Sequence, residues 1–350
     1  MPRILLAGDH FVTPALFRDA LTAHVDPAVP VEYDDLTLPW PYTPFGDVDG
    51  VHEASGSAAD LIDALHETDV VVTQMAPFTA DVFAARPALR MVSVCRGGPV
   101  NVDLAAATAA GVIVTYAPGR NAQAAAEFAV GLMLTAMRRI SDGDRELRAG
   151  RWRGDYYAYS EVGVELGAAT VGLVGYGAIG RIVARILQAF GSTVIAYDPY
   201  ADPDALQRDG VRGVALPELL GLADVVSLHA RLTPETRHII AAGELGLMRR
   251  GAVIVNSARG DLLDYDALPA LLADGSLAAA AFDVFDVEPP PPGWPLLRAG
   301  NVVATPHLAG ATKQTAQRAA DIVATDVATY LRGDVPEHVA NPAVLDRIAR

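Results

Sequence analysis

The segment 170–198 constrains the fold of this chain more than any other, because it places a glycine turn between two apolar runs. The first run, Val171–Val174, leads into the turn, and apolar residues at helical spacing follow within Ile179–Phe190. Gly191 suits a left-handed helix end, and the second run, Val194–Tyr197, comes directly after it. This order is typical of a βαβ unit, and it predicts a parallel sheet.

The turn has the pattern G-x-G-x-x-G, made by Gly175, Gly177 and Gly180. The first glycine allows a tight turn, the second lets a pyrophosphate approach the backbone, and the third lets helix and strand pack closely. The pyrophosphate would lie on the N–H groups and the positive dipole end of the helix. Asp198 is placed to accept hydrogen bonds from ribose hydroxyls, which disfavours the alternative of a turn that only packs a helix.

Asp198 also predicts which dinucleotide binds. A carboxylate there accepts from the free 2′-hydroxyl of NAD and repels the 2′-phosphate of NADP. The residues that follow, Pro199–Asp202, supply no arginine or lysine for that phosphate. We therefore expect NAD as the cofactor.

The composition narrows the class of protein. A length of 350 residues predicts two domains, and a hydrophobic content of 51% excludes a disordered chain. A formal charge of −15 argues against nucleic acid or an acidic membrane as partner. Cys95 is the one cysteine, so no disulfide framework is expected, and neither a signal peptide nor a transmembrane run is recognisable. We expect a cytoplasmic protein without a metal site.

Short apolar runs alternate with helical stretches along the chain, which predicts an α/β fold with two doubly wound parallel sheets. Residues 1–118 and 312–350 are expected to form a flavodoxin-like substrate domain, residues 119–311 a Rossmann NAD-binding domain, with a cleft between. The expected strands are Ile4–Ala7, Val31–Tyr33, Val70–Thr73, Met91–Val94, Val112–Thr115, Val225–Leu228, Ala252–Asn256, Ala278–Phe282 and Asn301–Thr305. The expected helices are Pro14–Ala23, Ala58–His66, Thr79–Ala84, Leu104–Ala110, Ala122–Ile140, Glu218–Leu222, Ala242–Met248, Tyr265–Ala273 and Thr312–Leu331.

Three other stretches carry specific expectations. Leu38–Gly56 is rich in proline, glycine and aspartate, and it predicts a surface loop. Ala122–Ile140 is so apolar that we expect it to be buried between domains or subunits. Arg151–Val164 is an aromatic arm without clear periodicity, and either a surface loop or an arm that wraps a second subunit fits it.

Three segments near the carboxyl ends of the late strands carry the groups for chemistry on a 2-oxo or 2-hydroxy acid. They contain Arg259, Glu288 and His307, and ligands of open α/β sheets bind beyond such strand ends. The arginine can bind a carboxylate with two hydrogen bonds. The histidine can give a proton to a keto oxygen and take it back, while the glutamate orients the imidazole. Each residue taken singly is more often structural, but their joint placement after a dinucleotide unit favours catalysis.

These motifs, in this order, resemble the D-isomer-specific 2-hydroxyacid dehydrogenases, the group that includes D-3-phosphoglycerate dehydrogenase. The resemblance extends over nearly the whole chain. It is carried by 111–127, 172–181, 228–236, 256–260, 283–289 and 305–310.

The resemblance implies roles for individual residues. By position, Arg259 resembles the substrate-binding arginine, Glu288 the partner of the histidine, and His307 the acid/base. The NAD site would be lined by Gly175, Gly177, Ala178, Ile179, Gly180, Asp198, Ser257, Ala258, Asp283, His307 and Gly310. The substrate loop would include Arg96, Gly97 and Gly98, and a homodimer is implied.

Three positions depart from the family pattern. The substrate loop reads Cys95–Asn101, with an extra charge at Arg96 and a proline that lacks a donor. Gln74 and its neighbours hold no arginine where phosphoglycerate enzymes place one, and Arg231 stands where a proline is common. These departures argue against a phosphorylated substrate, unless Arg96, Arg120 or Arg231 supplies the charge.

We therefore expect an NAD-dependent oxidoreductase that interconverts a small D-2-hydroxy acid and its 2-oxo acid. The substrate is a small anion held between the domains. The alternative from another class is a non-catalytic NAD(H) sensor or corepressor on the same fold. A methyltransferase that shares only the Rossmann unit is disfavoured by the late motifs. The sequence leaves the identity of the acid open.

Overall fold

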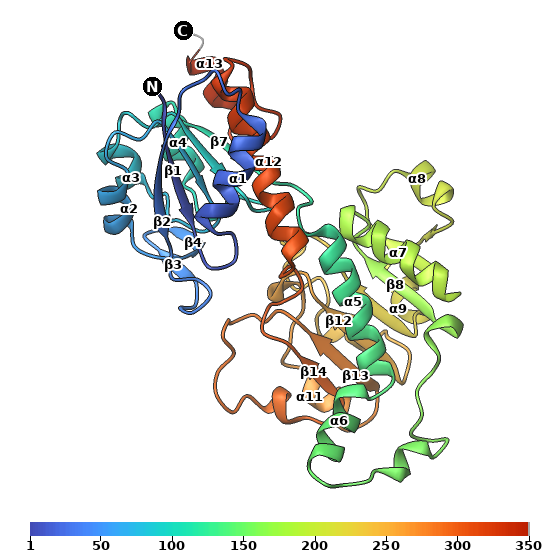
Figure 1. The fold of residues 1–350 in the computed structure, drawn as a ribbon. Coiled ribbons are helices and arrows are strands. Elements are labelled where there is room, and N and C mark those ends of the chain that lie inside the picture. The colour runs from blue at the N-terminus through green and yellow to red at the C-terminus, as the bar shows by residue number, and fades with distance from the viewer. Residues whose placement is uncertain (349–350) are drawn as a thin grey trace. The chain divides into compact units, whose positions relative to one another are not determined.

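The computed structural model describes residues 1–348, and its backbone contacts divide the chain into two units. Met1–Asn121 and the chain from Ala311 on form the first unit, and Ala122–Gly310 form the second. Each unit is built on one parallel sheet with helices on both faces (Figure 1). The prediction of an α/β fold with two parallel sheets is confirmed.

The sheet of the first unit has the strand order β2-β1-β5-β6-β7, which is the flavodoxin-like order. Its strands are β1 (Arg3–Gly8), β2 (Glu32–Thr37), β5 (Val70–Thr73), β6 (Met91–Val94) and β7 (Ile113–Tyr116). Its helices are α1 (Pro14–His24), α2 (Ala58–Ala64), α3 (Ala80–Ala85), α4 (Leu104–Ala110), α12 (Lys313–Leu331) and α13 (Leu345–Ile348), with a 3₁₀ turn at Pro342–Val344.

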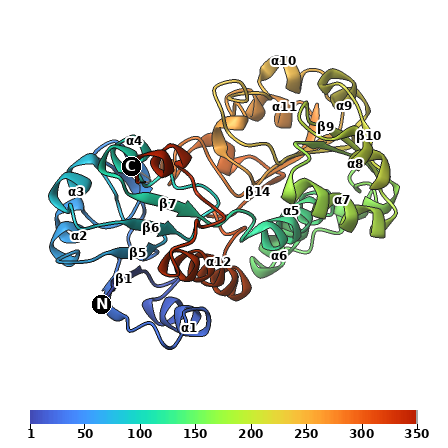
Figure 2. The same ribbon diagram turned by 90° about the horizontal axis from the view of Figure 1, so that it is seen from above.

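Alternate strand residues of this sheet enter two different cores. Ile4 and Leu6 pack with α1 and α12 on one face, and Leu5 and Ala7 pack with α2, α3 and α4 on the other. Figure 2 shows α12 beside α1, and α12 also contacts β6 and β7. The long helix α12 therefore belongs to the first unit.

The segment Leu38–Gly56 is not a plain loop. It contains a two-stranded antiparallel hairpin, β3 (Gly46–Val48) and β4 (Val51–Ala54), and Val51 is only 2% exposed. The prediction of a surface loop is wrong here. The strands are short, and their few apolar residues stand among many turn residues, so the sequence pattern did not indicate them.

The sheet of the second unit has the order β10-β9-β8-β11-β12-β13-β14, a Rossmann order extended by one strand. Its strands are β8 (Thr170–Val174), β9 (Thr193–Tyr197), β10 (Arg212–Gly213), β11 (Val225–Leu228), β12 (Ala252–Asn256), β13 (Leu277–Phe282) and β14 (Val302–Ala304). Its helices are α5 (Ala122–Met137), α6 (Ile140–Arg148), α7 (Ala178–Phe190), α8 (Pro203–Arg208), α9 (Leu216–Leu222), α10 (Ala242–Leu245) and α11 (Leu268–Ala273). Its 3₁₀ turns are Gly154–Tyr157, Leu166–Ala168, Gly260–Leu262 and Pro295–Arg298.

Helix α5 packs on the sheet and on helix α7 of its own unit. Ala129, Val130 and Met133 share a core with α7 and with strand residues such as Val255. This packing covers one side of the helix, and the expectation that a second domain or subunit covers the rest stays a prediction. The apolar face of the sheet accounts for its composition.

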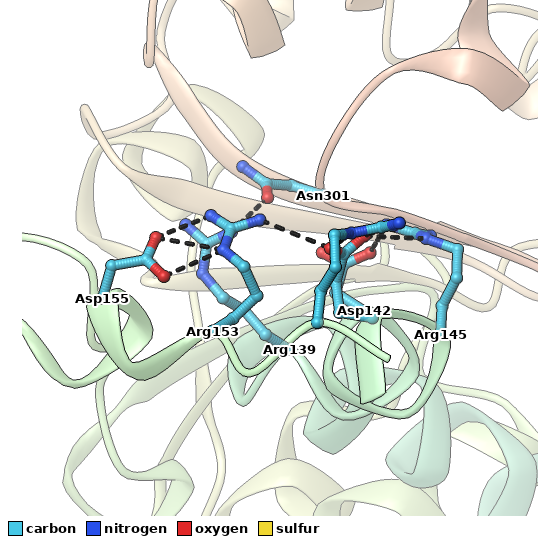
Figure 3. Close-up of polar contacts among 8 residues, drawn as sticks. Arg139, Asp142, Arg145, Arg153, Asp155 and Asn301 are labelled. Carbon is cyan, nitrogen blue, oxygen red and sulfur yellow. Dashed lines mark hydrogen bonds and ion pairs between the residues drawn. The ribbon is translucent and has the colours of Figure 1, made fainter. Parts of the chain in front are cut away.

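The arm 151–164 is held by charged contacts rather than by a core. Arg151 of the arm pairs with Glu146 of α6 at 2.6 Å, and Glu161 of the arm pairs with Arg139 at 3.4 Å. Arg139 also donates to Asn301, and Arg153 pairs with Asp155 at 2.6 Å within the arm (Figure 3). Several large side chains on the arm are exposed, with Tyr159 at 96%. The structure thus gives the arm a scaffold and leaves its aromatic side chains outside. These are Trp152, Tyr157 and Tyr159.

Candidate active site

The glycine turn follows β8 and opens α7 in the second unit. Gly175 has a φ of 100°, and a Cβ atom at this position would lie 2.5 Å from the backbone nitrogen of Ala230. A Cβ on Gly180 would lie 2.5 Å from the carbonyl oxygen of Gly175. Both positions therefore require glycine, the first for conformation and packing and the second for packing.

Gly177 differs from the other two glycines. Within the described part of the chain, no atom lies within 4 Å of the point where its Cβ would be. Gly177 is the N-cap of α7, and no side chain among the described residues caps the helix there. Ala178 and Ile179 are the first residues of α7, so their N–H groups lie at this open helix end. The open space and the uncapped N–H groups fit a pyrophosphate.

Asp198 lies just beyond β9 and faces the glycine turn. Its carboxylate accepts from the backbone N–H of Tyr176 at 2.7 Å and from that of Tyr200 at 2.9 Å. These contacts fix the carboxylate beside the turn, where a dinucleotide places its adenosine ribose. The residues present therefore fit NAD.

The second group of predicted residues follows β12, β13 and β14, which are adjacent in the same sheet. Carboxyl ends of parallel strands share one edge, so this group and the glycine turn lie on the same edge. Asn256 ends β12, and its side chain accepts from Ala258 N–H at 3.1 Å and donates to the Arg259 carbonyl at 2.9 Å. Ser257 and Ala258 lie in this short turn.

His307 lies in a left-handed turn after β14, with a φ of 55°. Such a conformation is unfavourable for a histidine and needs support from its surroundings. Asp283, which is fully buried, gives that support to the turn that ends at Gly310. Its carboxylate accepts from Leu308 N–H at 2.8 Å, from Ala309 N–H at 2.7 Å and from the Thr305 hydroxyl at 2.6 Å.

The imidazole of His307 is bound to Glu288. The distance from His307 Nδ1 to Glu288 Oε2 is 2.7 Å, and Glu288 Oε1 accepts from Phe285 N–H at 2.9 Å. The side chains are 31% and 21% exposed, so the pair is accessible without being fully solvated. A carboxylate bound to one ring nitrogen directs the other nitrogen towards a reacting group.

Arg259 lies at the exposed end of its turn. Its guanidinium donates to the Ala258 carbonyl at 2.7 Å. Gly260 packs so closely on the next segment that a Cβ there would lie 1.9 Å from the Phe285 carbonyl oxygen. This contact joins the segment of Arg259 to the segment of Glu288.

The predicted substrate loop belongs to the first unit and follows β6. Gly97 and Gly98 are open, with no described atom within 4 Å of either Cβ position. Arg96, in contrast, is bound: its guanidinium contacts the Glu53 carboxylate and donates to the Glu53 carbonyl at 3.0 Å. Its charge is therefore already matched by a carboxylate of β4.

Sequence reasoning missed one role and one residue that hold this site. Asp283 was predicted to bind cofactor, whereas its support of the His307 turn was not foreseen. Tyr265 joins the two segments, since it accepts from the Asn256 amide at 3.2 Å and donates to the Val284 carbonyl at 2.8 Å. Burial raises the pKa of Tyr265 well above its ordinary value. A tyrosine shortly after the 256–260 motif was the available signal.

The sheet order, the glycine turn and the His307–Glu288 pair together define a dinucleotide-binding protein of the Rossmann type. Comparisons with known proteins identify one family within this class. Residues 130–309 match the family model described as D-isomer specific 2-hydroxyacid dehydrogenase, NAD binding domain.

Similar proteins have been characterised by sequence and by structure. A glyoxylate reductase from Korarchaeum cryptofilum is 38% identical over 84% of this chain and 89% of the relative. A D-3-phosphoglycerate dehydrogenase from Methanocaldococcus jannaschii is 38% identical over 84% of this chain but 56% of the relative, so the chain spans about half of that protein. The crystal structure of a glyoxylate reductase from Paecilomyes thermophila is similar with a TM-score of 0.77, at 27% identity over 97% of this chain and 98% of that one.

The chain belongs to the D-isomer specific 2-hydroxyacid dehydrogenase family. It is an oxidoreductase that uses NAD. Among residues 1–348, no helix is long and apolar enough to cross a membrane.

Proposed function

We propose that the protein interconverts a small D-2-hydroxy acid and its 2-oxo acid. The observation that carries this proposal is the 2.7 Å hydrogen bond between His307 and Glu288, on the sheet edge that also holds the glycine turn. The relatives named glyoxylate reductase support a short 2-oxo acid as substrate.

When bound at the glycine turn, NAD would supply or accept the hydride that is exchanged at C2 of the substrate. We propose that the N–H groups of Gly177, Ala178 and Ile179 hold its pyrophosphate and that Asp198 holds its ribose. Ser257, Ala258, Asp283 and Gly310 complete the proposed cofactor site. All of these residues lie in the second unit, which is the proposed NAD-binding domain.

His307 moves the proton. Nδ1 is bound to Glu288, and we propose that Nε2 is the ring atom that acts on the substrate oxygen. During reduction, Nε2–H gives its proton to the carbonyl oxygen as the hydride reaches C2, and the C=O becomes CH–OH. During oxidation, the neutral imidazole takes the hydroxyl proton back. Glu288 keeps the ring in one orientation through both directions.

Arg259 binds the carboxylate of the substrate through its guanidinium. Positioning C2 and the keto oxygen in this way is a large part of the catalytic effect. Gly97 and Gly98 are proposed to add backbone donors, and Arg96 is proposed to shape the loop. They belong to the first unit, the proposed substrate domain.

The experiment is NADH oxidation with a panel of 2-oxo acids, read from NADH absorbance. The panel contains glyoxylate, hydroxypyruvate, phosphohydroxypyruvate and sugar-acid analogues. The change His307→Ala is expected to lower kcat by about 100- to 10,000-fold while the Kd for NADH stays within error. His24→Ala, a change at an exposed histidine of the first unit, is the control and is expected to keep full activity.

Two results would contradict the proposal. Full activity of the His307→Ala variant excludes the proton role. NADH binding without reduction of any acid in the panel favours the alternative, an NAD(H) sensor on the same fold.

We further propose that the protein works in the cytoplasm as a homodimer and does not bind nucleic acid. The charge of −15 and the exposed aromatic residues of the arm support these expectations. Light scattering of the purified chain would measure the mass of the assembly directly.

A further inference from the structure

Glu288 lies on an irregular segment of the second unit, and its place there depends on side-chain contacts. Residues 283–294 lie between β13 and the 3₁₀ turn Pro295–Arg298, and this fully described stretch contains neither helix nor strand. The Glu288 carboxylate nevertheless has two fixed partners, the backbone N–H of Phe285 at 2.9 Å and His307 Nδ1 at 2.7 Å. The contacts that hold Phe285 therefore also determine where the partner of the imidazole lies.

Phe285 belongs to a group of three aromatic side chains, Tyr265, Phe285 and Trp294, which we call the ring cluster. The ring centroids of Phe285 and Trp294 are 5.9 Å apart with an interplanar angle of 78°, which is an edge-to-face contact. The Tyr265 ring lies 5.6 Å from that of Trp294 and 6.5 Å from that of Phe285. Phe285 is 7% exposed, and Trp294 is partly buried against the same core. The ring cluster thus joins this segment to the core of the sheet.

The ring cluster also closes the loop that carries Glu288. Phe285 precedes Glu288 by three positions and Trp294 follows it by six, so the contact between the two rings joins both ends of one short loop. Four consecutive prolines, residues 289–292, lie between Glu288 and Trp294. Because proline fixes φ, this stretch has few backbone conformations. A displacement of Trp294 is therefore transmitted to Glu288 rather than absorbed by the loop.

The other members of the ring cluster are held from the sheet side. The Tyr265 hydroxyl donates to the Val284 carbonyl at 2.8 Å. Gly260 packs against the carbonyl of Phe285, with only 1.9 Å from its Cβ position to that oxygen. Trp294 is the member that comes from the far end of the loop, so its ring is the contact that keeps the loop closed.

We propose that Trp294 is a positioning residue for the acid/base pair. Its ring holds Phe285, the N–H of Phe285 fixes the Glu288 carboxylate, and the carboxylate orients His307. This inference rests on the proposed function, because it assumes that His307 transfers the proton. Removal of the ring leaves every polar group of the pair in place, so it loosens their geometry without changing their chemistry. The consequence is slower proton transfer with unchanged cofactor binding.

The test is a double-mutant cycle in the full-length enzyme, made with Trp294→Ala and Glu288→Ala. In the otherwise unmodified protein, Trp294→Ala is expected to lower kcat about tenfold while the Kd for NADH stays within error. In the Glu288→Ala background the same change is expected to lower kcat by less than about twofold, because the carboxylate that Trp294 positions is already gone. Both values are measured with the 2-oxo acid of the panel that the unmodified protein reduces fastest.

Further variants separate positioning from a general loss of packing. Trp294→Phe keeps a ring and is expected to retain kcat within about twofold. Leu297→Ala removes a side chain that is 42% exposed on the adjoining 3₁₀ turn, and its kcat is expected to match that of the unmodified protein. Circular dichroism shows whether each variant is folded. If Trp294→Ala is not, Trp294→Leu takes its place in the cycle, with an expected decrease in kcat of about threefold.

Two results would overturn the inference. Equal losses of kcat in the two backgrounds would show that Trp294 only packs the core, and an unchanged kcat in folded Trp294→Ala would show that the ring is not needed. Failure of the proposed function has a different signature. If His307→Ala keeps full activity, or if no acid is reduced, the proposed function and this inference are both wrong. If His307→Ala loses turnover and the cycle shows no coupling, only this inference is wrong.

Discussion

Two turns of the second unit place the backbone in the left-handed region, and the structure supports them by different means. At Gly175 the turn packs against the backbone of Ala230, and the lack of a Cβ atom makes this conformation possible. At His307 the turn carries a large side chain, and hydrogen bonds to Asp283 and Glu288 hold it. The first turn is shaped by packing and the second by charge.

The difference teaches what each turn can tolerate. The glycine turn has no room for one more carbon atom at Gly175 or at Gly180. The His307 turn depends on buried carboxylate oxygens, so it is sensitive to a loss of charge at constant volume. The predictions below test these two sensitivities.

The largest effect is expected for Gly175→Ala. The added Cβ would meet backbone atoms at 2.5 Å and the positive φ would be strained, so the turn must shift. We expect NADH binding to weaken by about 100-fold and the free energy of unfolding to fall by about 2–3 kcal/mol. Calorimetric titration and thermal unfolding measure these quantities.

Gly177→Ala is the matched control for that change. Its Cβ has open space in the described structure, so stability is expected to stay within about 0.5 kcal/mol while NADH binding weakens. Normal NADH affinity in this variant would contradict the assignment of Gly177 to the pyrophosphate site.

The second prediction concerns Asp283→Asn, which keeps volume and removes charge. An amide NH₂ would face the N–H of Leu308 or Ala309, so the His307 turn would lose its support. We expect kcat to fall about 10- to 100-fold, from a loss of about 1.5–3 kcal/mol. Steady-state kinetics measure the effect.

Asp286→Asn provides a control on the same segment, because Asp286 is exposed. Its kcat is expected to match that of the unmodified protein. If Asp283→Asn also kept full turnover, charge would not be what holds the His307 turn.

The third prediction concerns Asp198→Asn. The variant keeps a side-chain oxygen for the Tyr176 N–H but no longer repels a 2′-phosphate. The preference for NADH over NADPH is expected to fall about tenfold, which corresponds to about 1.4 kcal/mol. The ratio of kcat/KM values for the two cofactors measures it, and an unaltered ratio would show that other residues set the choice.

The smallest effect is expected for Tyr265→Phe. The ring keeps its contact with Phe282, and only the hydroxyl bonds to Asn256 and Val284 are lost. We expect a stability loss of about 1 kcal/mol and a decrease in kcat of less than about tenfold. Denaturant unfolding and kinetics check both values. A loss as large as that of Asp283→Asn would make Tyr265 an equal support of the site.

The sequence predicts the local parts of this fold well, and the reason is physical. Strand β8, the turn and α7 lie within a few tens of residues, and their periodicity and glycines depend on neighbours in the chain. The three late segments were predictable because strand ends fall where apolar runs stop. The hairpin at 46–54 was missed, since its apolar residues are few and lie between turn residues.

What the sequence could not provide was the partner of each polar group. Asp283 and Leu308 are separated by 25 positions, and Arg96 and Glu53 by 43. Such contacts arise only after strands have been ordered in a sheet. The sequence position of Asp283 therefore predicted a cofactor-binding residue. Its contacts in the structure show that it also supports the backbone of the His307 turn.

The arm scaffolded by Arg139 and Arg153 has a practical consequence. Trp152 is 86% exposed, so its indole emits in water, at long wavelength and open to collisional quenchers. The other two tryptophans, Trp40 and Trp294, are partly buried. Any molecule that covers the arm would shift the emission of Trp152 to the blue and protect it from iodide. The fluorescence of Trp152 can therefore be used to detect binding of another molecule to the arm, without an added label.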